Sequence, residues 1–227
     1  MSKNTIFPDT TSFNKSTAIE LKNIVDSHLL SLGIDTVKVG SNKEILNDLD
    51  LQVELQTVST ALKVSGEKET RIALQEYFTA LGYQTKRNGI NVFVRVPLAS
   101  SAHQVDLEVI HNVTEVSHYH MHNIPAGSPW KGVSKMILIG TLAKDMGFMF
   151  SAWEGLYIRT ADNKKGALYA INWDDIAAIL LGPNASGKDL ECVEAVLAAL
   201  PEEQGQELLD RCRKDKVWYE DISQILA

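Results

Sequence analysis

Two aspartates, Asp48 and Asp50, stand one residue apart at the start of a stretch that alternates polar and hydrophobic residues. In a β-strand, residues two apart project from the same face. The polar face would comprise Asp48, Asp50, Gln52 and Glu54, and the hydrophobic face Leu49, Leu51, Val53 and Leu55. Gathered carboxylates repel one another unless a cation neutralises them, and Mg²⁺ prefers oxygen ligands. The paired aspartates therefore predict a Mg²⁺ site, whereas Glu54, about 20 Å from Asp48 at ~3.3 Å per residue, is expected to be solvated.

Asp106 is the preferred candidate for a third metal ligand. It lies in the β-rich stretch of residues 104–110, with hydrophobic residues on both flanks. Glu108 shares its face of the predicted strand and is the reserve candidate. The predicted metal ligands are therefore Asp48, Asp50 and Asp106.

Gly40 and Ser41 form a predicted turn shortly before the paired aspartates. The order of a Gly-Ser turn, an Asp-x-Asp strand and a later strand with a single Asp resembles the nucleotidyltransferase superfamily, to which DNA polymerase beta and poly(A) polymerases belong. The resemblance covers roughly residues 17–110. It implies a helix that opens at Gly40 and Ser41 and holds the nucleotide's phosphates through its amides. Because only six residues separate Ser41 from Asp48, this helix is expected to be about one turn long.

The same resemblance implies a reaction. Asp48 and Asp50 would bind two Mg²⁺ ions, and Asp106 would help to activate the attacking hydroxyl. Two such ions clamp the attacking and leaving oxygens of an in-line displacement. The implied activity is transfer of a nucleoside monophosphate from an NTP such as ATP to a hydroxyl acceptor, with release of pyrophosphate. Lys131 and Lys135 lie where such proteins often place phosphate-contacting lysines, and the alternative for both is a solvated helix face.

Residues 182–188 contain a second nucleotide-binding pattern, G-x-x-x-x-G-K, which ends at Lys188. A P-loop would need Ser or Thr at the next position, where this chain has Asp189, and fewer than forty residues remain for the rest of such a fold. The segment is predicted instead to form a helix from Trp173 to a stop at Gly182, followed by a turn and another helix.

Five of the six histidines lie between His103 and His122. If residues 118–122 formed a strand, His118, His120 and His122 would share one face and could bind Zn²⁺. The alternative is a polar wall or loop beside the active site, because no cysteine or supporting acid pattern accompanies them. The cluster leaves open a second function, a non-catalytic nucleotidyltransferase-like or metal-binding interaction module.

The chain of 227 residues has a formal net charge of −7 and an isoelectric point near 5.4. This balance argues against binding of long DNA, which needs many phosphate contacts. A local basic cluster consists of Arg211, Arg213, Lys214 and Lys216. The acceptor is therefore expected to be a small molecule, a protein hydroxyl or a short RNA end.

Two further features bear on the protein's compartment. Cys192 and Cys212 are the two cysteines of the chain, and they are expected to be reduced and structural. No stretch approaches the ~20 apolar residues of a membrane span. A soluble, cytoplasmic protein without a membrane partner is expected.

Periodicity and turn residues predict helices over residues 17–33, 67–81 and 133–144 and in the last fifty residues, strands over 36–39, 49–55, 91–96 and 104–110, and a hairpin within 153–169. A capping box from Thr17 to Glu20 marks the predicted start of the first helix. The fold class is α+β. We expect a nucleotidyltransferase-like mixed sheet with flanking helices over residues 1–124, followed by a mainly helical C-terminal domain over residues 125–227.

Overall fold

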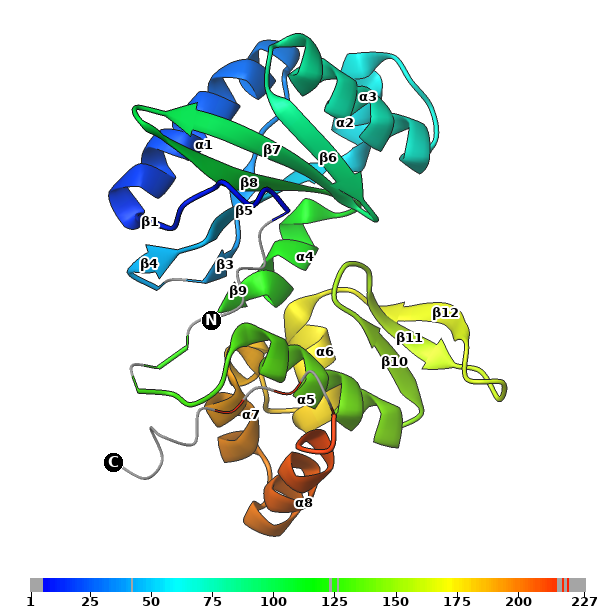
Figure 1. The fold of residues 1–227 in the computed structure, drawn as a ribbon. Coiled ribbons are helices and arrows are strands. Elements are labelled where there is room, and N and C mark those ends of the chain that lie inside the picture. The colour runs from blue at the N-terminus through cyan, green and yellow to red at the C-terminus, as the bar shows by residue number, and fades with distance from the viewer. Residues whose placement is uncertain are drawn as a thin grey trace. The chain divides into compact units, whose positions relative to one another are not determined.

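The computed structural model describes residues 6–41, 43–122, 124–125, 127–215, 218 and 220, except for the side chains of residues 41, 121 and 122. The chain divides into two compact units, Met1–Val113 and Thr114–Ala227, called unit 1 and unit 2 below (Figure 1). The composition predicts a boundary after residue 124, and the structure divides the chain at the start of helix α4 (Val113–His120). Within the described ranges, no helix is both long and apolar enough to cross a membrane.

Unit 1 is built on a five-stranded mixed sheet. Across the sheet the order is β2 (Val37–Lys38), β5 (Asp48–Glu54), β8 (Ser101–Ile110), β7 (Asn91–Leu98) and β6 (Gln84–Asn88). Strands β5 and β8 are parallel, and the other neighbouring pairs are antiparallel. Two further short strands, β1 (Phe13–Asn14) and β4 (Ile45–Leu46), pair with each other. The parallel pairing of β5 and β8 matters for function, because it brings two distant polar stretches side by side.

Three helices flank the sheet of unit 1 and share its hydrophobic core (Figure 1). They are α1 (Lys15–Leu29, followed by the 3₁₀ turn Leu30–Leu32), α2 (Leu55–Leu62) and α3 (Glu67–Ala80). On β5, the side chains of Leu49, Leu51 and Val53 are at most 1% exposed and belong to this core. The predicted alternation of β5 is therefore confirmed, and its polar residues project from the opposite face.

The first helix begins earlier than its predicted capping box. Its N-cap is Asn14, whose side chain accepts a hydrogen bond of 3.0 Å from the Thr17 amide. Thr17 is thus a donor inside the first turn, and the prediction that it caps the helix was wrong.

The segment that joins β2 to β5 contains strands where the family resemblance implies a helix. Gly40–Ser41 form the two-residue strand β3, and β4 follows at Ile45–Leu46. Residues 43–47, the described part of the chain between Ser41 and Asp48, contain no helix. The expectation of a one-turn helix with amides aimed at phosphates is not met in this described segment.

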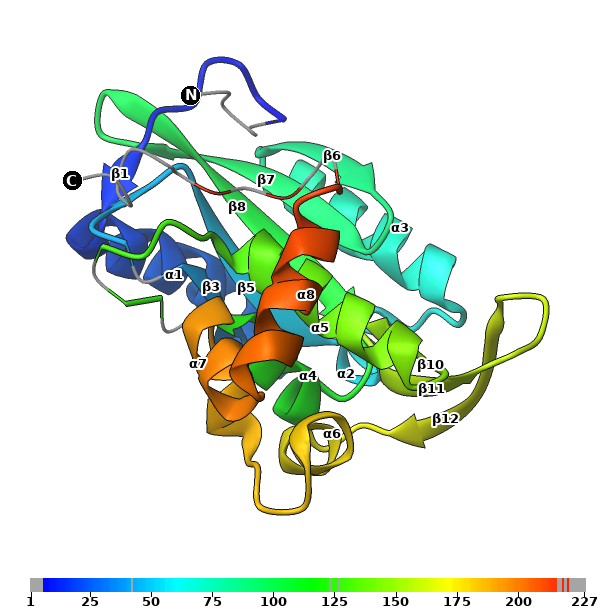
Figure 2. The same cartoon turned by 90° about the horizontal axis from the view of Figure 1, so that it is seen from below.

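Unit 2 combines helices with a three-stranded antiparallel sheet. The sheet order is β10 (Phe148–Ser151), β11 (Gly155–Arg159) and β12 (Lys165–Ala170). After α4 come the two-residue strand β9 (Met121–His122) and the helices α5 (Gly132–Asp145), α6 (Trp173–Leu181), η2 (Gly187–Leu190), α7 (Val193–Ala199) and α8 (Glu202–Cys212). Helices α5, α7 and α8 lie together in both views (Figure 2). The two units confirm the α+β class, and unit 2 contains a sheet beside its helices.

Candidate functional site

Four carboxylates gather on the polar side of the sheet in unit 1. Asp48 and Asp50 lie on β5, and Asp106 and Glu108 lie on β8. The parallel register places Asp50 directly beside Asp106, on strands whose backbones are about 4.8 Å apart. Val105, Leu107 and Val109 of β8 point to the core, so the intervening acids share the face of the β5 acids. We call these four residues the acidic face.

Two buried glutamines bind the carboxylates of β8. Gln104 donates from Nε2 to Asp106 Oδ1 at 2.8 Å, and Gln52 donates from Nε2 to Glu108 Oε2 at 2.8 Å. Both glutamines are 0% exposed. Neither glutamine was predicted to be functional, although each stands two residues from an acid and so shares its face of the strand. That alternation was the available signal.

Burial raises the pKa values of the three aspartates, and repulsion by neighbouring carboxylates adds to the rise for Asp50 and Asp106. Burial is the largest cause in each case: it raises the pKa of Asp48, raises that of Asp50 well above its usual range, and raises that of Asp106 to about 7. The charges of Asp48, Asp106 and Glu108 raise the pKa of Asp50 further. For Asp106, the hydrogen bond from Gln104 opposes the rise. The acidic face is therefore an environment in which a bound cation would favour the ionised carboxylates.

Gly40 lies directly against this face. A Cβ atom at position 40 would stand 2.4 Å from Asp50 Oδ2, and the backbone φ of Gly40 is +83°. Both facts favour glycine, because other residues rarely adopt this φ and the added carbon would collide with the carboxylate. The structure thus places Gly40 against Asp50, which lies beside Asp106. Ser41 follows in β3, and its side chain lies outside the described residues.

Glu54 is outside the acidic face and has a partner that the sequence does not reveal. Its carboxylate accepts hydrogen bonds from the backbone amides of Asn112 (3.3 Å) and Val113 (2.9 Å), where α4 begins. Carboxylates bind well at helix N-termini, where amides lack partners within the helix. The prediction that Glu54 is merely solvated was wrong.

The acidic face offers carboxylate oxygens, the type of donor that Mg²⁺ prefers. Within the described residues, no group of three His, Cys, Asp or Glu side chains is arranged to hold one metal ion. Mg²⁺ is usually bound by one or two carboxylates together with substrate phosphates, so a complete protein cage is not required. The adjacent Asp50 and Asp106, with Asp48 two residues along β5, supply oxygen donors of the right chemistry.

No protein-family model and no curated protein matches this chain. The remaining candidate residues of the sequence analysis lie in unit 2.

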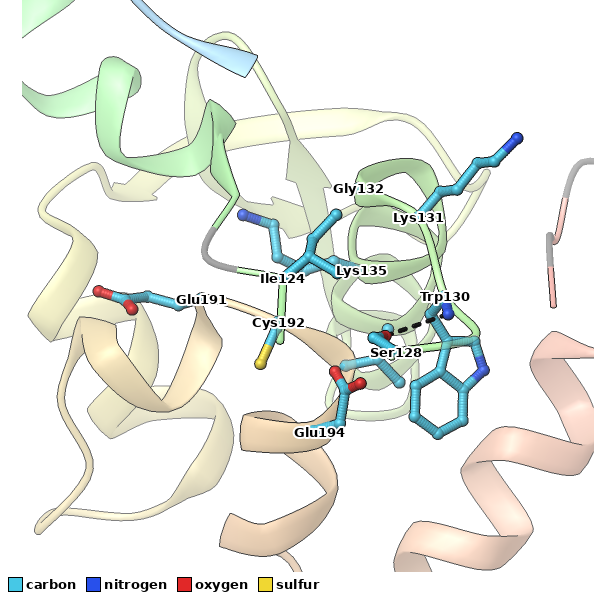
Figure 3. A pocket seen from close by; sticks show the side chains of 10 residues that line it. Ile124, Ser128, Trp130, Lys131, Gly132, Lys135, Glu191, Cys192 and Glu194 are labelled. Atoms are coloured by element: carbon cyan, nitrogen blue, oxygen red, sulfur yellow. Dashed lines mark hydrogen bonds between the residues drawn. The ribbon is translucent and has the colours of Figure 1, made fainter. Parts of the chain in front are cut away.

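Lys131 and Lys135 stand at the beginning of α5 and have different surroundings. Lys131 is exposed, and its side chain points away from Glu191 and Cys192 (Figure 3). Lys135 is 1% exposed and donates from Nζ to the carbonyl oxygen of Tyr119 at 2.7 Å. Burial lowers the pKa of Lys135 to about 7. The alternative prediction, an exposed position on a helix, therefore applies to Lys131 and does not apply to Lys135. Phosphate contact by either lysine stays a prediction.

A small hollow adjoins these lysines. Lys135, Glu191, Cys192 and Glu194 are among the residues that line it (Figure 3). Tyr119 stands in the last turn of α4, so the ammonium group of Lys135 complements the carbonyl end of that helix. This contact gives Lys135 a structural role inside unit 2.

The histidines of residues 118–122 do not form a common face. Residues up to His120 belong to α4, where positions two apart point in different directions, and β9 begins only at Met121. His118 is exposed, while His120 Nε2 lies 2.6 Å from the carbonyl oxygen of Ala152. The side chain of His122 lies outside the described residues. The prediction of a three-histidine strand face was wrong.

The G-x-x-x-x-G-K segment has none of the surroundings of a P-loop. Helix α6 precedes it instead of a strand, and residues from Gly187 form the short 3₁₀ helix η2. Asp189 accepts a hydrogen bond of 2.8 Å from the amide of Ser186 and caps this turn. The predicted helix, turn and helix are confirmed, and Lys188 lies within the turn.

Proposed function

We propose that this protein is a Mg²⁺-dependent nucleotidyltransferase, which moves a nucleoside monophosphate from an NTP to a hydroxyl acceptor and releases pyrophosphate. The observation that carries the proposal is the register of β5 and β8, which sets Asp50 beside Asp106 and close to Gly40. Buried carboxylates with raised pKa values are typical of functional sites, and a hard divalent cation with oxygen ligands would neutralise their charge.

Three residues would hold the metal ions, namely Asp48, Asp50 and Asp106. When bound, two Mg²⁺ ions would neutralise phosphate charge and orient the attacking and leaving oxygens. The NTP would supply the remaining oxygen ligands through its phosphates, which agrees with the incomplete set of protein ligands.

The protein's own groups have distinct roles in this proposal. Asp106, as a ligand of a metal ion, would help to activate the attacking hydroxyl. Gly40 would let the Asp50 carboxylate lie directly against the backbone, because glycine has no side chain. Gln104 and Gln52 would keep the carboxylates of β8 in place.

The acceptor would be small or short. A polymer track needs many basic side chains to neutralise phosphates, and this chain has 22 Lys and Arg against 29 Asp and Glu. We therefore propose a small molecule, a protein hydroxyl or a short RNA end as the acceptor, and exclude long DNA.

The test is incubation of the full chain with each α-labelled NTP, Mg²⁺ and a cell extract, with release of pyrophosphate and transfer of label as the readouts. Asp50→Asn should abolish both. The matched control is Asp162→Asn, the same change at an exposed aspartate of the β11–β12 loop, and it should keep full activity. Activity that survives in Asp50→Asn would refute the proposed site.

A non-catalytic module is the competing function. In that case the acidic face would bind a nucleotide or cation without turnover. Binding of NTP with Mg²⁺ by the wild-type chain, together with no label transfer to any fraction of the extract, would favour it.

A further inference from the structure

Gln104 connects the acidic face to the N-terminal segment Ile6–Thr11. Its Oε1 accepts a hydrogen bond of 2.6 Å from the backbone amide of Ile6, and its Nε2 donates to Asp106 Oδ1 at 2.8 Å. The Gln104 side chain is 0% exposed. Because both ends of the amide group are engaged inside the protein, Gln104 cannot turn without losing a hydrogen bond to one of these partners.

The N-terminal segment is itself fixed to the sheet at several points. The contacts are Lys86 Nζ to the Ile6 carbonyl (3.0 Å), Arg95 Nε and Nη2 to Asp9 Oδ2 (3.0 and 2.6 Å), and the Thr11 amide to the Ala102 carbonyl (2.9 Å). Phe7 is 4% exposed, and Lys86 Nζ lies 5.3 Å from the centre of its ring. The segment therefore packs along strands β6, β7 and β8. This packing holds the Ile6 amide within hydrogen-bonding distance of Gln104 Oε1.

We propose that Gln104 is a positioning residue, which transmits the docking of the segment Ile6–Thr11 to Asp106 and so sets the affinity of the acidic face for a divalent cation. This inference rests on the proposed function, since it takes Asp106 as a metal ligand. The hydrogen bond from Gln104 occupies Oδ1 of Asp106, so Oδ2 would be the oxygen left to bind a cation. Groups that orient a ligand in this way typically change metal affinity by 10- to 100-fold when they are removed.

The amide side chain at position 104 suits this role better than the alternatives. A carboxylate there would add a negative charge beside Asp106 and could not donate to it. An apolar side chain would leave both the Ile6 amide and Asp106 without a buried partner. A glutamine alone among residues of this length accepts from one partner while it donates to the other.

The experiment measures binding of Mn²⁺ to the full chain by electron paramagnetic resonance, with Mn²⁺ alone as the probe of an oxygen-ligand site. Two variants break the connection at different ends. Gln104→Met removes both hydrogen bonds, and Ile6→Pro removes only the backbone donor, because proline has no N–H. Ile6→Ala keeps the N–H and is the matched control. The dissociation constant should rise about tenfold or more in the first two variants and stay unchanged in the control.

The spectrum of bound Mn²⁺ should also change in Gln104→Met and Ile6→Pro, which a purely structural role would not cause. Equal affinity and equal spectra in the wild type and these two variants would overturn the inference and leave the proposed function intact. No Mn²⁺ binding by the wild type would overturn this inference, whereas the label-transfer assay decides the proposed function. If Gln104→Met does not fold, Ile6→Pro against Ile6→Ala decides the question.

Discussion

Replacing Asp106 by asparagine should stabilise the protein when no divalent cation is present. Asp106 is buried beside Asp50 and in the field of Asp48 and Glu108, and burial is the largest cause of its raised pKa. An asparagine has nearly the same shape, carries no charge, and can accept the hydrogen bond of Gln104 through its own Oδ1. The substitution therefore removes the unfavourable charge and retains the packing.

The size of the effect follows from the pKa of Asp106, which is raised from 3.8 to about 7. One pKa unit corresponds to 1.36 kcal/mol, so the ionised carboxylate destabilises the folded state by about 4 kcal/mol above pH 7. The folded state keeps the proton that the unfolded state has lost between about pH 4 and 7, so this cost develops as pH rises through that window. A hydrogen bond to a neutral acceptor is weaker by about 1 kcal/mol. We expect a net gain of about 3 kcal/mol at pH 8 and less than about 1 kcal/mol at pH 5.

The assay is hydrogen exchange of peptides from β5 and β8 across a urea series, in EDTA and in Mg²⁺. Tryptophan fluorescence is unsuitable for unit 1, because the four tryptophans, Trp130, Trp153, Trp173 and Trp218, all belong to unit 2. In EDTA at pH 8, the Asp106→Asn peptides should be better protected than those of the wild type. Adding Mg²⁺ should reduce the difference in protection between Asp106→Asn and the wild type, because the cation stabilises the wild type more than the variant.

Lower protection of β5 and β8 in Asp106→Asn, in EDTA at pH 8, would refute the reasoning that burial and repulsion destabilise the ionised acidic face. The control is Asp162→Asn in the β11–β12 loop, where hydrogen bonds to Lys164 and Thr160 lower the pKa of the aspartate. It should leave the exchange of β5 and β8 unchanged.

Three further perturbations test other parts of the structure. Lys135 has a pKa of about 7 in the folded state against an ordinary value of 10.5, so the unfolded state binds more protons between these two pH values. From pH 7 to 9 the unfolding free energy of the wild type should therefore rise by about 2 kcal/mol relative to that of Lys135→Met, as measured by urea unfolding with tryptophan fluorescence. Parallel pH profiles of the two proteins would contradict this. Gly40→Ala should cost about 1–3 kcal/mol and weaken Mn²⁺ binding, because its Cβ would meet Asp50; Gly33→Ala, with φ +72° and open space, is the control whose Mn²⁺ affinity should not change. Asn14→Ala should cost about 1 kcal/mol through loss of the α1 N-cap, measured by exchange of α1 peptides, and unchanged exchange would show that the cap is dispensable.

The face pattern of the strands could be predicted from the sequence because it depends on local alternation. Leu49, Leu51 and Val53 face the core as expected, and the aspartates between them face the other way. The same rule placed Asp106 on the polar face of β8. The adjacency of Asp50 and Asp106 came only from a resemblance, since no local pattern specifies which strands pair.

The errors arose where distant residues decide the local structure. Residues 113–120 form a helix, and Glu54 accepts hydrogen bonds from the backbone amides at its start. These amides belong to Asn112 and Val113, which are 58 and 59 residues away from Glu54 in the sequence. A local signal was present, because the buried Val113, Val116 and Tyr119 are three residues apart, as on one side of a helix. The alternating histidines suggested a strand instead.

Lys135 shows the same limit for side-chain burial. Lys135 lies near the start of α5, and a lysine at such a position is usually exposed. Its burial depends on the carbonyl of Tyr119 and on the ring of Trp173, 5.7 Å from Nζ. Neither partner is close in sequence, so no pattern around residue 135 predicts the contact.

The parallel pairing of β5 and β8 also has a consequence for the order of folding. Strands β6, β7 and β8 are consecutive and antiparallel, so they can form by local closure. The contact between β5 and β8 closes a much longer loop, as shown by the sequence separation of 56 between Gln52 and Glu108, and such contacts form more slowly. The repelling carboxylates therefore meet only when this last strand pair closes. A divalent cation that bridges them would act on the final closure, so we expect Mg²⁺ to accelerate the slowest refolding phase of unit 1 and to leave the earlier formation of the β6–β8 meander unchanged.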